Sequence, residues 1–151
     1  MFPTDRNFPE VGTLTAEFDN DFKFSSFEGG VNFFFHAGAI GLIYLVATQS
    51  LSDTTSNDMR MSFSPDIKTQ RYDFPSPFFP FPLKFIEKWY DGDTYEKSYR
   101  TLPDVGYINV RKFDINAGTF QAEFDITIEE AGKQHRATGE IDIEKWTEVR
   151  K

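Results

Sequence analysis

The stretch Thr119–Ile128, TFQAEFDITI, alternates strictly between polar and apolar side chains, with an apolar residue at every even position. Successive side chains of a β-strand point to opposite faces, whereas a helix would scatter these five apolar side chains around its circumference. The stretch therefore predicts a strand with one face buried and the other in water.

The same alternation recurs on both sides of this strand. Glu129–Lys133 contains a glycine and suits a hairpin that leads to a partner strand at Gln134–Ile143. Upstream, Gly106–Phe113 is expected to be a strand that ends in the turn Asp114–Gly118, where Asn and Gly tolerate positive φ. Further strands are expected at Thr13–Phe18, from Phe22 and Phe24 onward, and at Val31–His36, Ile40–Thr48, Arg60–Ser64, Thr69–Phe74, Leu83–Tyr90 and Thr94–Arg100.

The remaining segments do not favour helices. Thr48–Asp58 is polar apart from one leucine and is interpreted as a loop. The charged tail Glu144–Lys151 is the one segment with a spacing compatible with a short helix. The sequence thus predicts an all-β fold, a single-domain antiparallel β-sandwich or flattened β-barrel of about ten short strands. We expect one domain over residues 1–151, with an N-terminal arm at 1–10, a Phe/Pro-rich segment at 75–82 and the charged tail at 144–151.

Composition excludes several classes of protein. The net charge is −8 and no basic block occurs, which argues against a nucleic-acid partner. With no cysteine, disulfides and thiolate chemistry are excluded. The start, MFPTDR, has no basic region followed by an apolar run, so no signal peptide is expected in the chain given.

One uncharged region, Gly29–Ser52, needs a comparison with membrane spans. Its apolar centre, Phe33–Ala47, is 15 residues long, whereas a spanning helix needs roughly 20. We therefore expect buried strands and no permanent transmembrane span. Continuous apolarity in these strands suggests burial on both faces, or one face against the core and the other under a loop.

Three stretches resemble a family of small bacterial β-domains, mostly secreted or lipid-anchored and of unassigned function. Gly12–Phe22 is similar to the opening GTxTA hairpin of that family, and Gly106–Asp114 to its GxIxI strand. Gly118–Phe124 followed by Gly132–Lys133 and Thr138–Ile143 resembles its closing GtFxaxF…Gk…GxFdi pattern. The resemblance implies a β-sandwich or barrel-like module, an extracellular or cell-envelope location, and no catalytic residues to carry over.

The Phe/Pro-rich segment is the first candidate binding site. PSPFFPFP at residues 75–82 holds four of the eight prolines together with Phe78, Phe79 and Phe81. Proline fixes φ and removes a hydrogen-bond donor, so the segment is expected to be extended and outside the middle of the sheet. Its rings then either seal one end of the core as a lid or form an exposed apolar patch for a partner.

The second candidate site is aromatic and acidic. Trp89 and Tyr90 precede Asp91 and Asp93, and a flat ring beside carboxylates is a combination that suits carbohydrate, although rings in strands more often pack in the core. The closely spaced carboxylates also lack the longer ligand series of an EF-type calcium loop. No metal site and no cofactor are expected.

The inventory for catalysis is thin. Of the two histidines, His36 lies in an apolar run and is expected in the core, and His135 is expected to face solvent. Glu123 and Asp125 are expected on the wet face of one strand, where nothing separates their pKa values. Because no nucleophile and base can be paired, we do not expect an enzyme.

Three hypotheses about function stay open at this stage. The first is a non-enzymatic binding or interaction module whose partner is a protein, a carbohydrate or a small apolar ligand, with homo-oligomerisation as a further option. The second is a carrier with an apolar ligand in an internal barrel cavity. The third is a membrane-active protein that uses the uncharged region at 29–52.

Overall fold

The computed structural model describes residues 9–19 and 21–148, and these form eleven antiparallel strands in one strongly curled sheet, a half-barrel. The all-β prediction is confirmed. Along the sheet the strands follow the order β5-β9-β10-β11-β1-β2-β3-β4-β6-β7, and β8 pairs with β10. The strands are β1 (Gly12–Phe18), β2 (Ser26–Ala37), β3 (Leu42–Ser50), β4 (Thr55–Phe63), β5 (Arg71–Asp73), β6 (Phe81–Asp91), β7 (Asp93–Ser98), β8 (Arg100–Thr101), β9 (Tyr107–Asp114), β10 (Thr119–Glu130) and β11 (Lys133–Ile143).

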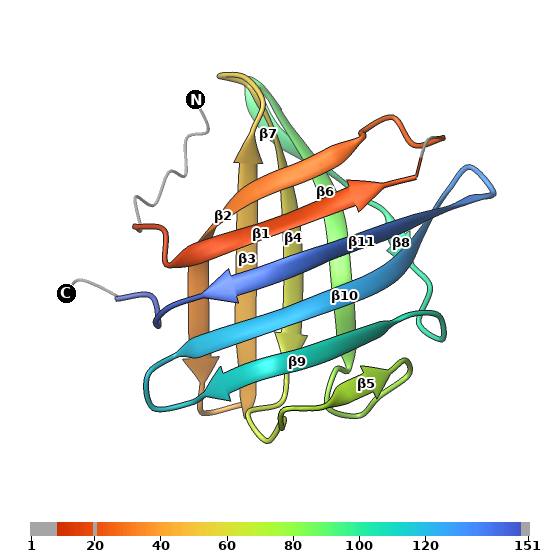
Figure 1. The fold of residues 1–151 in the computed structure, drawn as a ribbon. Helices are drawn as coiled ribbons and strands as arrows, with labels where there is room; N and C mark the ends of the chain where they lie inside the picture. Colours follow the sequence, from red (N-terminus) through yellow and green to blue (C-terminus); the bar gives the residue numbers. More distant parts are fainter. Residues whose placement is uncertain (1–8, 20, 149–151) are drawn as a thin grey trace.

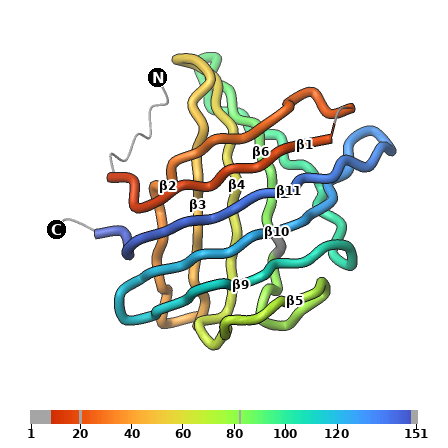
Figure 2. The backbone as a smooth tube through the Cα atoms, viewed as in Figure 1, coloured from red at the N-terminus to blue at the C-terminus, as the bar shows by residue number. Residues whose placement is uncertain are grey.

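The sheet folds back on itself through β2. The first part of β2 runs beside β1 across the front of the molecule, and the second part turns down beside β3 at the back (Figure 1). The tube in Figure 2 shows the front strands β1, β9, β10 and β11 crossing the back strands β3, β4 and β6. The inner faces of the two halves therefore enclose the core between them.

Alternation along the strands decides which side chains enter this core. In β10 the five apolar side chains at even positions from Phe120 to Ile128 are buried, as predicted from their pattern, and they belong to one hydrophobic cluster. Rings from the two halves meet there: Phe120 of the front half lies 4.8 Å from Phe63 of the back half, and Phe18 lies 5.2 Å from Phe85. Aromatic side chains therefore fill the space between the layers.

A short segment after β7 bridges β6, near one end of the sheet, and β10, near the other. Tyr99 N donates to Phe85 O of β6 at 3.0 Å, and Leu102 N donates to Thr127 O of β10 at 2.8 Å. Between them, Thr101 Oγ1 donates to Leu83 O at 2.8 Å. This segment, residues 99–102, links β6 to β10 and holds the half-barrel in its curl.

Several local predictions were wrong. The expected loop at Thr48–Asp58 is mostly strand, because β3 continues to Ser50 and β4 begins at Thr55, so that polar residues pair across the hairpin. His135 is buried against Phe22 and its Nδ1 lies 3.3 Å from Asp19 Oδ1. His135 lies near the start of β11, on the face that the strand turns to the core, where residues 137, 141 and 143 are also buried.

The C-terminal tail forms no helix over its described part, residues 144–148. Thr147 N donates to Phe34 O at 3.0 Å and Phe34 N donates to Thr147 Oγ1 at 2.8 Å. The indole of Trp146 stacks on Phe34 with ring centroids 4.5 Å apart. Two hydrogen bonds and ring stacking therefore fix the tail to β2. The rest of the tail, 149–151, and most of the N-terminal arm, 1–8, lie outside the described residues.

Among the described residues, the structure has no helix with the length and apolar character needed to span a membrane.

Candidate functional site

A groove of about 850 Å³ lies along the outer face of β3, β4, β6 and β7, and residues that follow β7 also line it. This volume falls within the range of about 300–1,000 Å³ that is typical of small-molecule sites. The residues that line it are Tyr44, Leu45, Val46, Arg60, Met61, Ser62, Phe81, Lys84, Ile86, Glu96, Ser98, Tyr99, Arg100, Thr101 and Pro103.

The floor of the groove is apolar because β3 and β6 carry apolar residues on both faces. Ile43 and Leu45 of β3 point into the core, so their neighbours Tyr44 and Val46 point outward and stay half-buried. On β6, Ile86 also points outward but is only 2% exposed, and it lies outside the main hydrophobic cluster. The groove thus has a small apolar centre of its own.

Basic residues dominate the charge of the groove. Arg60, Lys84 and Arg100 line it together with a single carboxylate, Glu96. Three cations and one anion give the lining a charge of +2, in a chain whose net charge is −8. The groove is therefore a basic region of an acidic protein.

Two of these cations face each other directly. Arg60 of β4 and Lys84 of β6 are paired in register, and both line the groove. Like charges that lie directly opposite on a sheet destabilise it. The guanidinium of Arg60 is compensated, since its Nη2 atom lies 2.8 Å from Asp58 Oδ2 and 3.0 Å from Glu96 Oε1.

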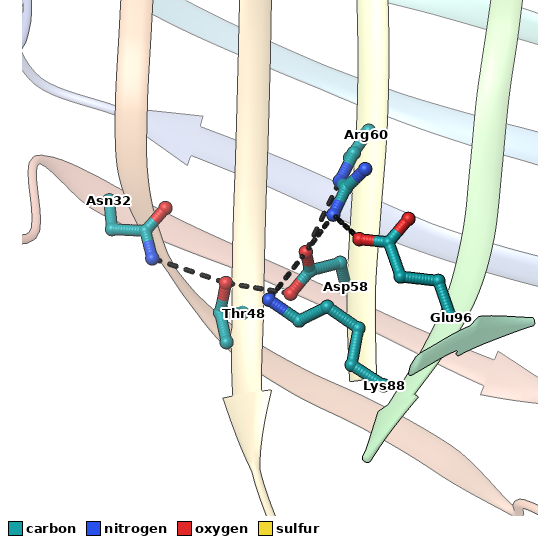
Figure 3. Close-up of polar contacts among 6 residues, drawn as sticks. All are labelled: Asn32, Thr48, Asp58, Arg60, Lys88 and Glu96. Carbon is teal, nitrogen blue, oxygen red and sulfur yellow. Dashed lines mark hydrogen bonds and ion pairs between the residues drawn. The ribbon is translucent and has the colours of Figure 1, made fainter. Parts of the chain in front are cut away.

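Asp58 anchors this arrangement from within the sheet surface (Figure 3). Its side chain is 1% exposed and accepts a hydrogen bond from Thr48 Oγ1 at 2.8 Å. Its Oδ2 also lies 3.1 Å from Lys88 Nζ. Thr48 in turn accepts a hydrogen bond of 3.1 Å from Asn32 Nδ2, so the network crosses from β2 to β7.

The same network sets the ionisation of Arg60. Burial lowers the pKa of Arg60, but the hydrogen bonds and negative charges of Asp58 and Glu96 outweigh burial and raise the pKa above its ordinary value. Arg60 is therefore a fixed cation in the wall of the groove. Its guanidinium is already held in one orientation, so Arg60 loses little conformational freedom when a ligand with a hydrogen-bond acceptor binds.

An apolar strip adjoins the groove on the β2 side. The pairing of β2 with β3 shifts between Val31 and Phe33. Because Val31 and Phe34 are both buried in the core, the shift leaves Phe33 facing outward beside Val46, and Phe35 beside Tyr44. The sequence left open whether this face is buried or lies under a loop; in the structure Phe33, Tyr44 and Val46 are half-buried and Phe35 is exposed.

The structure separates the three phenylalanines of the Phe/Pro-rich segment. Phe79 is 3% exposed and packs 5.6 Å from Phe63 in the core. Phe78 is 37% exposed and packs on Tyr72, and Phe81 is 59% exposed and lines the groove. One ring, Phe79, therefore covers the core, and the other two stay at the surface.

The aromatic and acidic site lies at the β6–β7 turn, and its members are not among the residues that line the groove. Trp89 stacks on Tyr95 with centroids 5.8 Å apart, and Tyr90 points to the opposite face of β6. Asp91 and Asp93 are exposed around Gly92, whose φ of 74° suits the tight turn.

The remaining titratable groups serve packing and ion pairs. Burial and hydrogen bonds to Glu87 and Glu130 raise the pKa of the Tyr99 hydroxyl far above its ordinary value. Asp125 is buried rather than wet, because Arg136 covers it and binds its carboxylate. In the described part of the chain no group of three His, Cys, Asp or Glu residues could hold a metal ion.

A second depression, of about 430 Å³, lies on the outer face of the front half. Its lining includes four carboxylates and no basic residue, and these are Glu17, Glu28, Glu123 and Glu140. It differs from the groove in charge, and both hollows lie outside the aromatic core.

Of the site residues predicted from the sequence, only Phe81 lines the groove. The other residues of the groove were not predicted. The sequence did hold a sign of the apolar floor. In Ile40–Thr48 both the odd and the even positions are apolar, so both faces of this strand carry an apolar surface. Arg60 and Lys84 gave no such signal, since only the pairing of β4 with β6 brings them together.

Comparisons with family models, with curated proteins and with solved structures returned no match to this chain. The resemblance to small secreted β-domains stays a prediction.

Proposed function

We propose that this protein is a non-enzymatic binding protein whose groove on β3, β4, β6 and β7 holds a small molecule with an apolar body. The observation that carries this proposal is a groove of small-molecule size with Tyr44, Val46 and Ile86 at its floor. The adjoining rings of Phe33 and Phe35 extend the apolar surface beyond the groove.

The lining supports binding rather than chemistry. It contains no histidine and no cysteine, and its single carboxylate, Glu96, is held by Arg60 at 3.0 Å. A nucleophile in the groove would need an adjacent base within hydrogen-bond distance. The hydroxyls of Ser62 and Ser98 have no such partner among the described residues.

An apolar fluorescent probe tests the proposal. Ser98 is exposed, lies opposite Ile86 in register and lines the groove, so that Ser98→Trp places an indole over the floor. We expect the wild type to bind the probe and S98W to bind it at least about tenfold more weakly, which corresponds to a loss of about 1.4 kcal/mol.

Thr94→Trp is the matched control. Thr94 is exposed on the same face of the same strand but does not line the groove, so T94W should bind the probe like the wild type. Equal probe binding by S98W and the wild type, or no binding by the wild type, contradicts the proposal. Urea unfolding of both variants checks that each is folded.

A further inference from the structure

We infer that the groove recognises a negatively charged end of its ligand, so that the ligand class is an anionic amphiphile with a carboxylate, sulfate or phosphate head and an apolar chain. The inference rests on the proposed function and adds the chemistry of the head group. Its observation is charge, which is independent of the apolar floor that carries the proposed function.

The cations around Arg60 are not fully neutralised. Arg60 is paired with Asp58 and Glu96, and Lys88 is paired with Asp58, whereas Lys84 is a further lysine on the same face. Within residues 9–19 and 21–148, no carboxylate lies within ion-pair distance of Lys84. The excess positive charge therefore resides at Lys84.

The position of Lys84 makes this charge available to a ligand. Lys84 is exposed and lies directly opposite Arg60 in register, so its ammonium adds positive charge beside a guanidinium that Asp58 and Glu96 already compensate. An anion at this place would gain a charge-assisted hydrogen bond from Lys84. Arg100 lines the same groove, and its Glu129 partner is 3.6 Å away, a long ion pair with both groups partly exposed.

The apolar residues lie where a chain attached to such a head would lie. Val46 is the direct neighbour of Arg60 on β3, and Phe33 is the direct neighbour of Val46 on β2. One row across the sheet thus runs from two cations to two apolar side chains. Ile86 and Phe81 flank the cations on β6. This order fits one charged head followed by an apolar chain.

Three ligands with the same chain test the head-group preference: dodecanoate, dodecanol and dodecylammonium, each titrated by calorimetry below the concentration at which it aggregates. We expect the order dodecanoate, dodecanol, dodecylammonium, with dodecanoate at least about tenfold tighter than dodecanol, as one charge-assisted hydrogen bond predicts. The advantage of dodecanoate should shrink at high salt.

A variant assigns the preference to Lys84. Lys84→Met keeps the apolar stem of the side chain and removes its charge, so we expect it to weaken dodecanoate about tenfold and to leave dodecanol within about twofold of the wild type. Lys112→Met is the matched control, because Lys112 is an exposed lysine of β9 that does not line the groove. K112M should bind all three ligands like the wild type.

The outcomes separate the two proposals. Equal affinity for dodecanoate and dodecanol, or unchanged dodecanoate binding by K84M, overturns the inference and leaves the apolar groove in place. If none of the three ligands binds, both the inference and the proposed function are wrong. Sedimentation with vesicles that contain phosphatidylserine is the last arm: vesicle binding without dodecanoate binding overturns the inference in favour of a membrane surface.

Discussion

Asp58 illustrates how one residue can organise a protein surface. An isolated carboxylate with this degree of burial would be protonated or excluded, because burying a charge costs several kcal/mol. Here Thr48, Arg60 and Lys88 surround it and supply hydrogen-bond donors and positive charge. Asp58 therefore holds the guanidinium of Arg60 in one orientation at the wall of the groove.

The partners of Arg60 should differ in their contribution to stability. Asp58→Ala leaves two cations without a buried counter-ion, and we expect it to lower the free energy of unfolding by about 3 kcal/mol. Glu96 contacts the same guanidinium but is exposed, so Glu96→Ala should cost less than about 1 kcal/mol. Urea unfolding of both variants measures the difference, and equal losses would show that burial of Asp58 is not what matters.

At the residue scale, the sequence predicted the residues of the core better than those at the ends of strands. Every apolar position of TFQAEFDITI is buried as its alternation required. His135 and Phe79 gave no such indication, because each is buried by residues distant in the sequence. Phe22 covers His135, and Phe63 and Tyr72 cover Phe79.

At the scale of elements, alternation predicted where strands run but not which outer faces are wet. In β10 and β11 the pattern alternates and one face is polar. In β2 and β3 apolar residues occupy both odd and even positions. The sequence alone could not show whether the second face of these strands is buried or exposed. The shift in pairing at Val31 and Phe33, which decides which rings face outward, depends on the partner strand.

The contact between β7 and β10 should make stability depend on pH. Lys97 Nζ lies 3.1 Å from Glu130 Oε2 and joins the two strands. Burial raises the pKa of Glu130, but hydrogen bonds from Lys97 and Tyr99 lower it by more, so its pKa in the folded protein is below the ordinary value. A lowered carboxylate pKa adds stability above the ordinary range of glutamate, and that stability is lost as the pH falls through the lowered pKa.

Glu130→Gln removes this contribution without changing the size of the side chain. We expect E130Q to be less stable than the wild type by about 0.5 kcal/mol near neutral pH, since the ion pair is partly exposed. The two proteins should converge in acid, where Glu130 is protonated in both states. A difference that persists unchanged in acid would show that the charge of Glu130 is not its cause.

At the scale of the whole molecule, the curl of the sheet creates two different surfaces from one set of strands. The inner faces form a core that aromatic rings fill. The outer face of the back half carries a groove whose floor is apolar and whose charge is positive. The all-β class followed from the sequence, but the strand order β4-β6-β7, which brings Arg60, Lys84 and Glu96 together, is a property of the assembled sheet.

NMR shows directly whether the outer groove binds an anionic amphiphile. Backbone amide signals of the isotope-labelled protein are followed during titration with dodecanoate. We expect the largest shifts for the amides of Val46, Arg60, Lys84, Ile86 and Ser98, while those of Ile126 and Ile141 in the front half stay in place. Shifts centred on the front half or on the Trp89–Tyr95 pair, or no shifts at all, would contradict this expectation.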